Sequence, residues 1–426
     1  MLTFRRALAV AIATMVAACG SDSAAPPGDT PGATSGKCGP NDASIVLPAG
    51  FCASIFADHI GAARHVVVAA NGDVFVTLQG GGPVVALRDV NHDGRADSVV
   101  TVGSGSGGTG IGLYAGFLYV DQGSQIIRYP LPTGALRPSG GGQAVVTALP
   151  TGGDHGARNF AIDAQGSLFV NIGSSTNSCQ QLNRSTGSPG IDPCTELNTR
   201  AGIWRFNANT TGQVFSSAQR FATGLRNSEG LAFGADGSLW AVTHGRDQLF
   251  DNWPKLFNAS YSAENPGEEL VQVNQGDDFG WPYCYYTMTN GKKLLLAPEY
   301  GGDGTMTTRC DQKKSAVIAM PGHWAPMSLL LYTGSAFPSH YRDGAFIAFH
   351  GSWNRAPQPQ AGFRVVFVPA ANGQPSTQYE TFADGFAGGN FDNPAHRPVG
   401  IAQGPSGEIY ITDDKGGRVW KVVYAP

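Results

Sequence analysis

Six stretches of the chain alternate apolar and polar residues with the period of two that a half-buried β-strand requires. Each opens at a small or glycine-containing turn, and several begin with the Asn-Gly, Asp-Gly or Ser-Gly pairs that favour hairpins. Most are followed by a second β-rich run: PVVALRDV, QIIRYPL, AGIWRFNA, FRVVFVPA and RVWKVVYA. The six stretches are NGDVFVTLQ (71–79), AGFLYVDQG (115–123), QGSLFVNIG (165–173), DGSLWAVTH (236–244), DGAFIAFHG (343–351) and SGEIYITDD (406–414).

Six such units with no helix-period stretch between them predict an all-β chain folded as a six-bladed β-propeller. A pair of β-sandwiches is the alternative. The spacing of the units is irregular, which indicates long inserts between blades, chiefly at 174–201 and 245–342. In a ring of blades such loops gather on one face and build the site. Trp204, Trp240 and Trp420 lie inside strand patterns and are expected in the core.

The composition supports this class and excludes others. The 426 residues include 59 Gly and 27 Pro, which weaken helix interiors and argue against a helical bundle. Hydrophobic residues at 42% and aromatic residues at 10% argue against disorder. The formal net charge of −4 lacks the basic footprint that a nucleic-acid partner requires.

The first residues predict export. Arg5 and Arg6 precede an apolar run, Ala7 to Ala18, that is too short to span a bilayer. The Val-Ala-Ala-Cys stretch that ends at Cys19 resembles a bacterial lipobox, with an ordinary secretory peptide as the alternative. We therefore expect a lipoprotein signal peptide over 1–18, a flexible tether over 19–40 and the propeller over 41–426. The protein would be lipid-anchored at the periplasmic side of the outer membrane, or at the cell surface, and would meet the membrane only through this anchor.

Six cysteines remain once Cys19 is set aside, and an even number in an exported protein indicates disulfides. Six cysteines allow 15 pairings. The simplest of them joins sequence neighbours. These pairs would be Cys38–Cys52, Cys179–Cys194 and Cys284–Cys310.

Several polar phrases carry candidate chemistry. His155 stands beside Asp154 just before a strand, where it can act as a general base with an orienting carboxylate. Arg226 and Asn227 hold the same position before another strand, and an arginine offers a planar fork of donors to a carboxylate. Gly245 would let backbone carbonyls approach a ligand or an ion. Each of these signals alone also fits an ordinary loop residue.

Polar segments of this kind occur in several of the repeats, and this recurrence supports a functional role for each of them. In a propeller, positions at the ends of strand phrases converge at one mouth of the central channel. A cluster of histidine and arginine there would suit an anionic, planar ligand bound face-on. The residues concerned are His155, Arg226, His323, His350 and Arg397, with Trp353, Asn354, Arg355 and His396 beside them.

Two acidic segments are candidate metal sites. In RDVNHDGRADSV, the residues Asp89, Asn91, Asp93 and Asp97 occupy positions 1, 3, 5 and 9 of an EF-hand-like loop. The acid of position 12 is missing, so the alternatives are a shortened Ca²⁺ loop and an Asp/Asn-rich hairpin turn. A second possible pair of oxygen ligands is Glu268 with Glu269, with a solvated acidic loop as the alternative.

Taken in order, these phrases resemble the glucose/sorbosone dehydrogenase family, whose members are six-bladed propellers that oxidise sugars with pyrroloquinoline quinone (PQQ) and Ca²⁺. The resemblance covers residues 45–424. The ordered set is specific, although each phrase alone is not. It consists of DHGARN, GLRNSEGLAF, HGRDQ, DFGWPYC, HWAP, HGSWNR and HRPVG with the later PSG and TDD.

The resemblance implies roles for individual residues. His155 would be the general base, next to Asp154, and Arg226 with Asn227 would contact the quinone and the substrate. The cofactor would also be lined or held by His323, Arg355 and Arg397. The backbone carbonyls of Gly245 and Arg246 would hold the active-site Ca²⁺, and Glu268 with Glu269 would lie near a structural Ca²⁺ site.

The sequence departs from the glucose enzymes of this family at three positions. Thr109 stands where they have a glutamine that approaches the substrate, Arg355 is the nearest cation to their cofactor-binding lysine, and Val399 replaces a second arginine. The chain therefore resembles the sorbosone-type branch. The expected activity is PQQ- and Ca²⁺-dependent oxidation of an aldose or a sorbosone-like sugar aldehyde, with electrons passing to an external quinone or cytochrome. The alternatives are a non-catalytic sugar- or protein-binding propeller and a Ca²⁺-dependent lactonase-like hydrolase.

Overall fold

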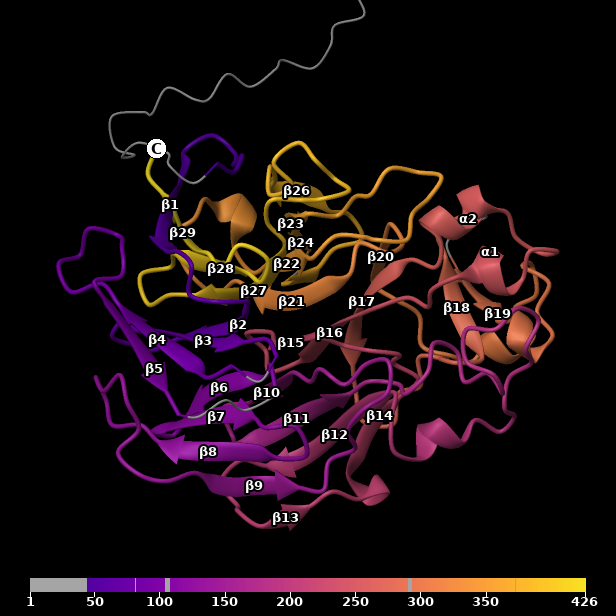
Figure 1. The fold of residues 1–426 in the computed structure, drawn as a ribbon, viewed down its shortest axis with the longest axis horizontal. Helices are drawn as coiled ribbons and strands as arrows, with labels where there is room; N and C mark the ends of the chain where they lie inside the picture. The colour runs from indigo at the N-terminus through magenta and orange to yellow at the C-terminus, as the bar shows by residue number, and fades with distance from the viewer. Residues whose placement is uncertain (1–43, 81, 104–107, 290–292, 372) are drawn as a thin grey trace, which may run out of the picture.

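The computed structural model describes residues 44–80, 82–103, 108–289, 293–371 and 373–426. Their main strands form six sheets of four or five strands, arranged as blades in a ring (Figure 1). Neighbouring blades touch through their first strands, β2, β6, β10, β15, β21 and β27. The predicted six-bladed β-propeller is therefore confirmed, and the alternative of paired sandwiches is wrong.

The first three blades follow one another along the chain. The first contains β2 (Ala63–Val68), β3 (Val74–Leu78), β4 (Val84–Arg88) and β5 (Ser98–Val102). The second contains β6 (Ile111–Tyr114), β7 (Phe117–Asp121), β8 (Ile126–Pro130) and β9 (Gln143–Thr147), with β13 (Gln213–Val214) added in parallel at its edge. The third contains β10 (Phe160–Ile162), β11 (Ser167–Ile172), β12 (Gly202–Asn207) and β14 (Arg220–Thr223).

The other three blades complete the ring. The fourth contains β15 (Gly230–Phe233), β16 (Leu239–Thr243), β17 (Glu268–Val273) and β20 (Ile318–Met320). The fifth contains β21 (Pro326–Leu331), β22 (Ala345–Phe349), β23 (Arg364–Val368) and β26 (Glu380–Ala383). The sixth contains β27 (Pro398–Gln403), β28 (Ile409–Asp413), β29 (Val419–Tyr424) and β1 (Phe51–Ala57).

The sixth blade closes the ring with a strand from each end of the described chain. Strand β1 pairs antiparallel with β29, so that Phe51 lies opposite Tyr424. Backbone hydrogen bonds therefore hold the first and last strands together. Aromatic residues also pack at this junction: the Phe51 ring meets those of Phe337, Tyr341 and Phe382 edge-on, with centroids 4.8–5.1 Å apart.

All six strand patterns found in the sequence are the second strands of blades, namely β3, β7, β11, β16, β22 and β28. The runs that follow five of them are the third strands. The third strand of the fourth blade, β17, was not predicted, because it begins with Glu268 and Glu269 and lies inside the 245–342 insert. The expected core tryptophans, Trp204, Trp240 and Trp420, are buried.

Two helices and a hairpin from the second insert lie at one side of the ring (Figure 1). The second insert contains α1 (Leu249–Asn252), α2 (Ala259–Glu264) and the hairpin of β18 (Cys284–Thr287) with β19 (Lys293–Leu296). A small hairpin elsewhere joins β24 (Ala370–Ala371) to β25 (Gln374–Pro375). Short 3₁₀ helices are η1 (Thr195–Asn198), η2 (Ser217–Gln219), η3 (Pro298–Tyr300), η4 (Thr308–Cys310) and η5 (Ser339–Tyr341).

Two of the expected disulfides are present, Cys179–Cys194 and Cys284–Cys310. Each closes a loop within one insert, and both pack in one buried apolar cluster with Trp281, Tyr283 and Tyr286, where the two inserts meet. The third expected pair involves Cys38, which lies outside the described residues. Within the ranges described above, no helix is long and apolar enough to cross a membrane.

Candidate active site

The candidate residues from different repeats lie at one rim of the propeller. His155, Arg226, His323 and Arg397 precede the first strands of their blades, whereas Gly245 and His350 follow second strands. The first and second strands of a blade are antiparallel, so the start of one and the end of the other share an edge. The two inserts also begin at second-strand ends and therefore reach the same rim.

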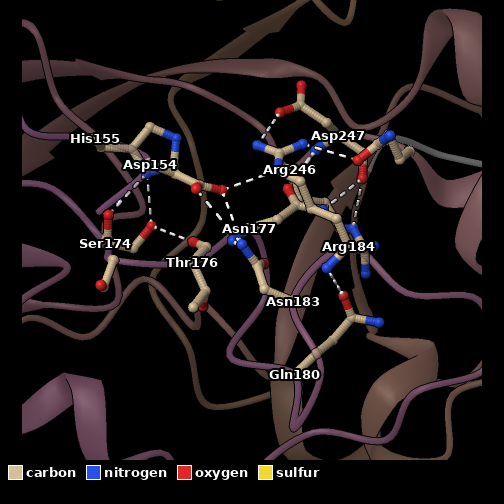
Figure 2. Close-up of polar contacts among 12 residues, drawn as sticks. Asp154, His155, Ser174, Thr176, Asn177, Gln180, Asn183, Arg184, Arg246 and Asp247 are labelled. Atoms are coloured by element: carbon tan, nitrogen blue, oxygen red, sulfur yellow. Dashed lines mark hydrogen bonds and ion pairs between the residues drawn. The ribbon is translucent and has the colours of Figure 1, made fainter. Parts of the chain in front are cut away.

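His155 is held in the protonation state that a base requires. Its Nδ1 lies 3.0 Å from the Ser174 carbonyl oxygen and 2.9 Å from the Ser174 Oγ (Figure 2). The carbonyl can only accept, and the Ser174 hydroxyl donates its own hydrogen to the carbonyl of Thr176 over 2.7 Å. Both partners are thus acceptors for an Nδ1–H group, which leaves the lone pair of the imidazole on Nε2.

The surroundings of His155 also keep it neutral. Burial lowers its pKa well below the usual value, and the nearby Arg226 and His244 lower it further. Gly173 allows this packing, because a Cβ there would lie 2.6 Å from the His155 Cβ and 2.7 Å from the Asn227 Oδ1. A neutral imidazole with a free Nε2 lone pair can take a proton from a bound molecule.

Asp154 does not have the expected role of orienting His155. Its carboxylate accepts a hydrogen bond from Arg184 Nε over 2.9 Å and a longer one, 3.3 Å, from Asn183 (Figure 2). Both partners belong to the insert after β11, so the Asp154 side chain contacts this insert and not the His155 ring. Ser174 orients the imidazole instead.

Arg226 is buried and held by four hydrogen bonds. Its Nε and Nη2 donate to the carbonyl and side-chain oxygens of Asn177 over 3.0 and 2.9 Å. Its Nη2 also donates to Asp247 over 3.0 Å, and its Nη1 donates to the Gly245 carbonyl over 2.7 Å. These hydrogen bonds hold the positively charged guanidinium of Arg226 in one buried position.

Asp247 is the centre of a group of residues that we call the Asp247 cluster: Arg184, Arg226, Asp247, His323 and Asn354. One carboxylate oxygen accepts from Arg226 and, over 3.1 Å, from Arg184. The other accepts from Asn354 Nδ2 over 3.1 Å and lies 3.6 Å from His323 Nδ1. Burial raises the pKa of Asp247, but Arg226, His323 and Arg184 outweigh burial and hold the pKa well below its usual range.

His323 belongs to this cluster, with each ring nitrogen facing an oxygen acceptor. Its Nε2 donates to the Ser262 carbonyl over 2.7 Å, and its Nδ1 faces Asp247. Burial opposes a charge on the ring, but Asp247 and Glu268 outweigh burial and raise the pKa of His323. The expected cofactor-lining residue is thus engaged with protein groups on both ring nitrogens.

A second group, the Asp414 cluster, consists of Arg64, His350, Arg397 and Asp414. Asp414 accepts from Arg64 Nη1 and from His350 Nε2, each over 2.9 Å. Arg397 Nη1 donates to His350 Nδ1 and to the Gly351 carbonyl, both over 3.2 Å. The Arg397 guanidinium lies 5.1 Å from the centre of the Phe363 ring. Burial lowers the pKa of His350 despite Asp414, so this imidazole is neutral.

Glu229 lies between Asn227 and Arg64. One of its carboxylate oxygens accepts from Asn227 Nδ2 over 3.3 Å, and the other lies 3.9 Å from Arg64 Nη2 in a buried ion pair. Among the described residues, this second oxygen and the Nε of Arg64 have no hydrogen-bond partner although both are buried. Buried polar groups are normally paired, so these two atoms are exceptions.

Four functional residues were not predicted from the sequence. Ser174 and Arg184 lie in an insert with no strand pattern, and Arg64 lies inside the apolar run of β2. Asp247 lies in the HGRDQ segment, but its contacts are with Arg184 and Asn354, which lie far away in the sequence. The strongest available signal was Arg64, which together with His65 interrupts a run of small and apolar residues.

The expected calcium ligands are occupied by protein groups. The Gly245 carbonyl accepts from Arg226, and the two oxygens of Glu268 accept from the backbone N–H groups of Gly245 and Ala325, over 2.9 and 3.2 Å. The Arg246 side chain is buried in an ion pair with Glu299. A carbonyl that already faces a guanidinium is a poor ligand for a divalent cation, so the Gly245 carbonyl does not fit Ca²⁺ at this position.

The other expected metal residues do not form a site either. Glu269 lies beside a cavity of about 30 Å³, and burial together with the charge of Glu268 raises its pKa to about 8. Asp97 and Asp89 accept hydrogen bonds from backbone N–H groups of their own loop, with Asn91 and Asp93 joined to the same network. This is the Asp/Asn-rich hairpin turn that was the alternative reading of 89–97. No group of three or more His, Cys, Asp or Glu able to hold a metal occurs in the described parts of the chain.

Arg355 is also placed differently from the expectation that it binds the cofactor. Its Nη1 donates to the carbonyls of Ala263 and Gly322, both over 2.8 Å, and its Nη2 pairs with Glu264. The side chain is buried, and it fastens the loop after β22 to the second insert.

The chain matches known proteins over most of its length. A model of the TrAA12-like family matches residues 45–425. A pyrroloquinoline quinone-dependent pyranose dehydrogenase from Coprinopsis cinerea is 26% identical over 237 residues, which cover 46% of this chain and 30% of that protein. The chain spans 61% and 30% of the length of the curated relatives that it matches.

Solved structures show the same fold. A carbohydrate-active enzyme of family AA12 from Trichoderma reesei superposes with a TM-score of 0.75 at 19% identity, covering 90% of this chain and 98% of that one. The holo form of the PQQ domain of the Coprinopsis cinerea pyranose dehydrogenase superposes with a TM-score of 0.71 at 18% identity, covering 89% and 97%.

Proposed function

Because this chain belongs to the TrAA12-like family, we propose that it is an oxidoreductase that oxidises a sugar with PQQ. The substrate would be an aldose or a sorbosone-like sugar aldehyde, and the electrons would pass to an external quinone or cytochrome. The observation that carries the proposal is the pairing of a neutral His155, whose Nε2 lone pair is free, with the fixed cations of the same rim.

The rim residues fit an anionic, planar cofactor. PQQ carries carboxylates, and arginine is the side chain best suited to bind them. Arg64, Arg226 and Arg397 would hold PQQ through the positive charges of their guanidinium groups. When bound, PQQ would supply the acceptor for the hydride that leaves the sugar carbon.

The chain itself would handle the proton. The Nε2 of His155 takes the proton of the sugar hydroxyl as the carbon gives up its hydride, and the sugar becomes a carbonyl compound or lactone. The Ser174 oxygens that accept from Nδ1–H stabilise the imidazolium that forms. Arg226 would stabilise negative charge at the reacting centre, because its four hydrogen bonds keep it in place without reorganisation.

Calcium at Gly245 and Arg246 is not part of the proposal. Arg226 donates to the carbonyl that would bind the ion, and it already supplies a positive charge at that point. The proposed chemistry therefore requires PQQ and the rim arginines, and no step depends on a metal.

The two alternatives have less support. A lactonase-like hydrolase needs several carboxylates around a central metal, and the described residues contain no such group. A non-catalytic binding propeller would not require that both the tautomer and the charge of His155 be controlled. We also propose, from the sequence alone, that Cys19 carries a lipid anchor and that the protein is exported.

Titration of the purified apo-protein with PQQ, followed by a panel of aldoses with an artificial dye acceptor, tests the proposed function. The proposal predicts saturable PQQ binding and sugar-dependent reduction of the dye. PQQ binding without any sugar oxidation would favour a non-catalytic protein, and absence of PQQ binding would refute the proposal.

A further inference from the structure

The loop that follows β22 crosses the rim between the two clusters. At its start, His350 Nε2 lies 2.9 Å from the Asp414 carboxylate. Four residues later, Asn354 Nδ2 donates to Asp247 over 3.1 Å. Residues 350–354 therefore run from the Asp414 cluster to the Asp247 cluster.

This loop is firmly held by its own polar residues. The Ser352 Oγ donates to Gln360 Oε1 over 2.7 Å and accepts from the backbone N–H of Ala361 over 2.9 Å. Arg355 is buried, and it donates to two carbonyls of neighbouring segments over 2.8 Å each. The backbone on both sides of Trp353 is thus fixed.

Trp353 itself is 66% exposed, although Ser352 and Arg355 beside it are buried. A large aromatic side chain that is left in water forgoes the stabilisation that burial would supply. The indole is presented to solvent at a fixed place on the rim. Next to it, the Oδ1 of Asn354 is a buried acceptor with no hydrogen-bond partner among the described residues.

These features match the two faces of a pyranose. A pyranose ring has an apolar face of C–H groups and a periphery of hydroxyls, so it needs a flat apolar surface beside polar groups. We propose that Trp353 is the platform on which the pyranose ring stacks. The inference rests on the proposed sugar oxidation and adds the residue that selects a ring-shaped substrate.

The occupant of the platform is the sugar and not the cofactor, for electrostatic reasons. An anionic quinone is drawn to the arginines of the rim, of which Arg64 and Arg226 are buried. The Trp353 indole is neutral and exposed, so it suits the neutral ligand that enters last from solvent. Because its loop is already held in place, stacking costs little conformational entropy.

The test compares Trp353→Ala, Trp353→Phe and a control that removes an exposed apolar side chain elsewhere, Val99→Ala on the outer strand β5. In the PQQ-loaded protein, Trp353→Ala should raise KM for pyranoses by about 10-fold, and kcat should stay within about threefold, since stacking acts on binding. Trp353→Phe should restore most of the affinity. KM for glycolaldehyde, which has no ring, should not change.

A binding measurement without turnover completes the test. A pyranose should protect tryptophan fluorescence of the unmodified protein from acrylamide quenching, and this protection should be absent in Trp353→Phe. An unchanged pyranose KM in Trp353→Ala would overturn the platform. So would a loss of PQQ affinity in that variant that accounts for the whole effect. If the unmodified protein oxidises glycolaldehyde but no pyranose, the platform is refuted, whereas failure to oxidise either compound with PQQ refutes the proposed function.

Discussion

The Arg226 guanidinium donates to the Gly245 carbonyl over 2.7 Å, so the oxygen that the sequence assigned to calcium faces a permanent positive charge. Arginine keeps this charge at any pH at which the protein is folded. Three further hydrogen bonds, to Asn177 and Asp247, keep the guanidinium from turning away. The Arg226 guanidinium would thus supply the positive charge that a calcium ion would otherwise bring to the site.

This contact predicts that the activity does not need calcium. Treatment of the PQQ-loaded protein with a chelator should leave the rate of sugar oxidation within about twofold, since no described side chains gather around a metal. Elemental analysis of the treated sample is the control. Loss of activity on chelation, with recovery on addition of Ca²⁺ alone, would contradict this prediction.

Arg184 is predicted to position the site although it is not part of the chemistry. It donates to Asp154 over 2.9 Å and to Asp247 over 3.1 Å, and so joins the residue before His155 to the partner of Arg226 (Figure 2). Arg184→Ala should lower kcat/KM by about 10-fold, because charge-assisted hydrogen bonds contribute about 1.5–3 kcal/mol when buried and less when partly exposed. The measurement is steady-state kinetics.

Two further variants separate positioning from general damage. Arg184→Lys keeps the charge and should recover part of the loss. Arg309→Ala removes a surface arginine that pairs with Asp192 near the same insert, and it should leave kcat/KM unchanged. An Arg184→Ala variant with normal kinetics would show that the link between Asp154 and Asp247 is dispensable.

Glu269 should make the stability of the protein fall as the pH rises from about 4.5 to about 8. Burial and the charge of Glu268 raise its pKa from 4.5 to about 8, so over this range the folded state holds a proton that the unfolded chain releases. The stabilisation is complete below the unfolded pKa and is lost as the pH rises through about 8. Thermal unfolding should therefore show a drop in Tm between about pH 4.5 and pH 8, with little further change from this group at higher pH.

Glu269→Gln is the matched variant, because it keeps the shape and cannot ionise. Its Tm should fall less over the same pH range, and the difference between the two proteins isolates Glu269 from other groups. Parallel Tm curves for the two proteins would mean that Glu269 is ionised in the fold.

The lipid anchor is a prediction of the sequence alone. If Cys19 is lipidated, replacing Cys19 with Ser should move the protein from the membrane fraction to the soluble periplasm, because the acyl chains provide the attachment. Fractionation followed by immunoblotting measures this. Unchanged association of the variant with membranes would refute the lipobox interpretation.

The fold could be predicted because second strands repeat a local pattern. Each of the six has period-two alternation next to a turn, and this signal is contained within nine residues. Strand β17 was not predicted because Glu268 and Glu269 interrupt the alternation of apolar and polar residues. In the fold, Glu268 is buried and its two oxygens accept backbone N–H groups, which explains how a carboxylate is tolerated there.

The site was only partly predictable because its contacts are long-range. Arg64 and Asp414 are separated by 350 residues, and Arg184 and Asp247 by 63. No local pattern indicates that such side chains will meet. The prediction that Asp154 orients His155 relied on the adjacency of the two residues in the sequence. It was wrong because the Asp154 carboxylate pairs with Arg184 and not with His155.

Arg397 and His155 are predicted to act on different molecules. Arg397→Ala should weaken PQQ binding by roughly 30- to 150-fold, the equivalent of about 2–3 kcal/mol for a charge-assisted contact. Turnover at saturating PQQ should fall less than it does in a His155 variant. An Arg397→Ala protein that binds PQQ normally would remove this arginine from the cofactor site.

If His155 takes the substrate proton, the turnover of His155→Ala at saturating PQQ should fall sharply. The variant should turn over roughly 10²- to 10⁴-fold more slowly, the usual contribution of general acid–base catalysis. Its PQQ affinity, measured by titration, should change little, because the proposed role of Nε2 is toward the sugar and not toward the cofactor. A His155→Ala protein that oxidises sugar at nearly the full rate would contradict the account.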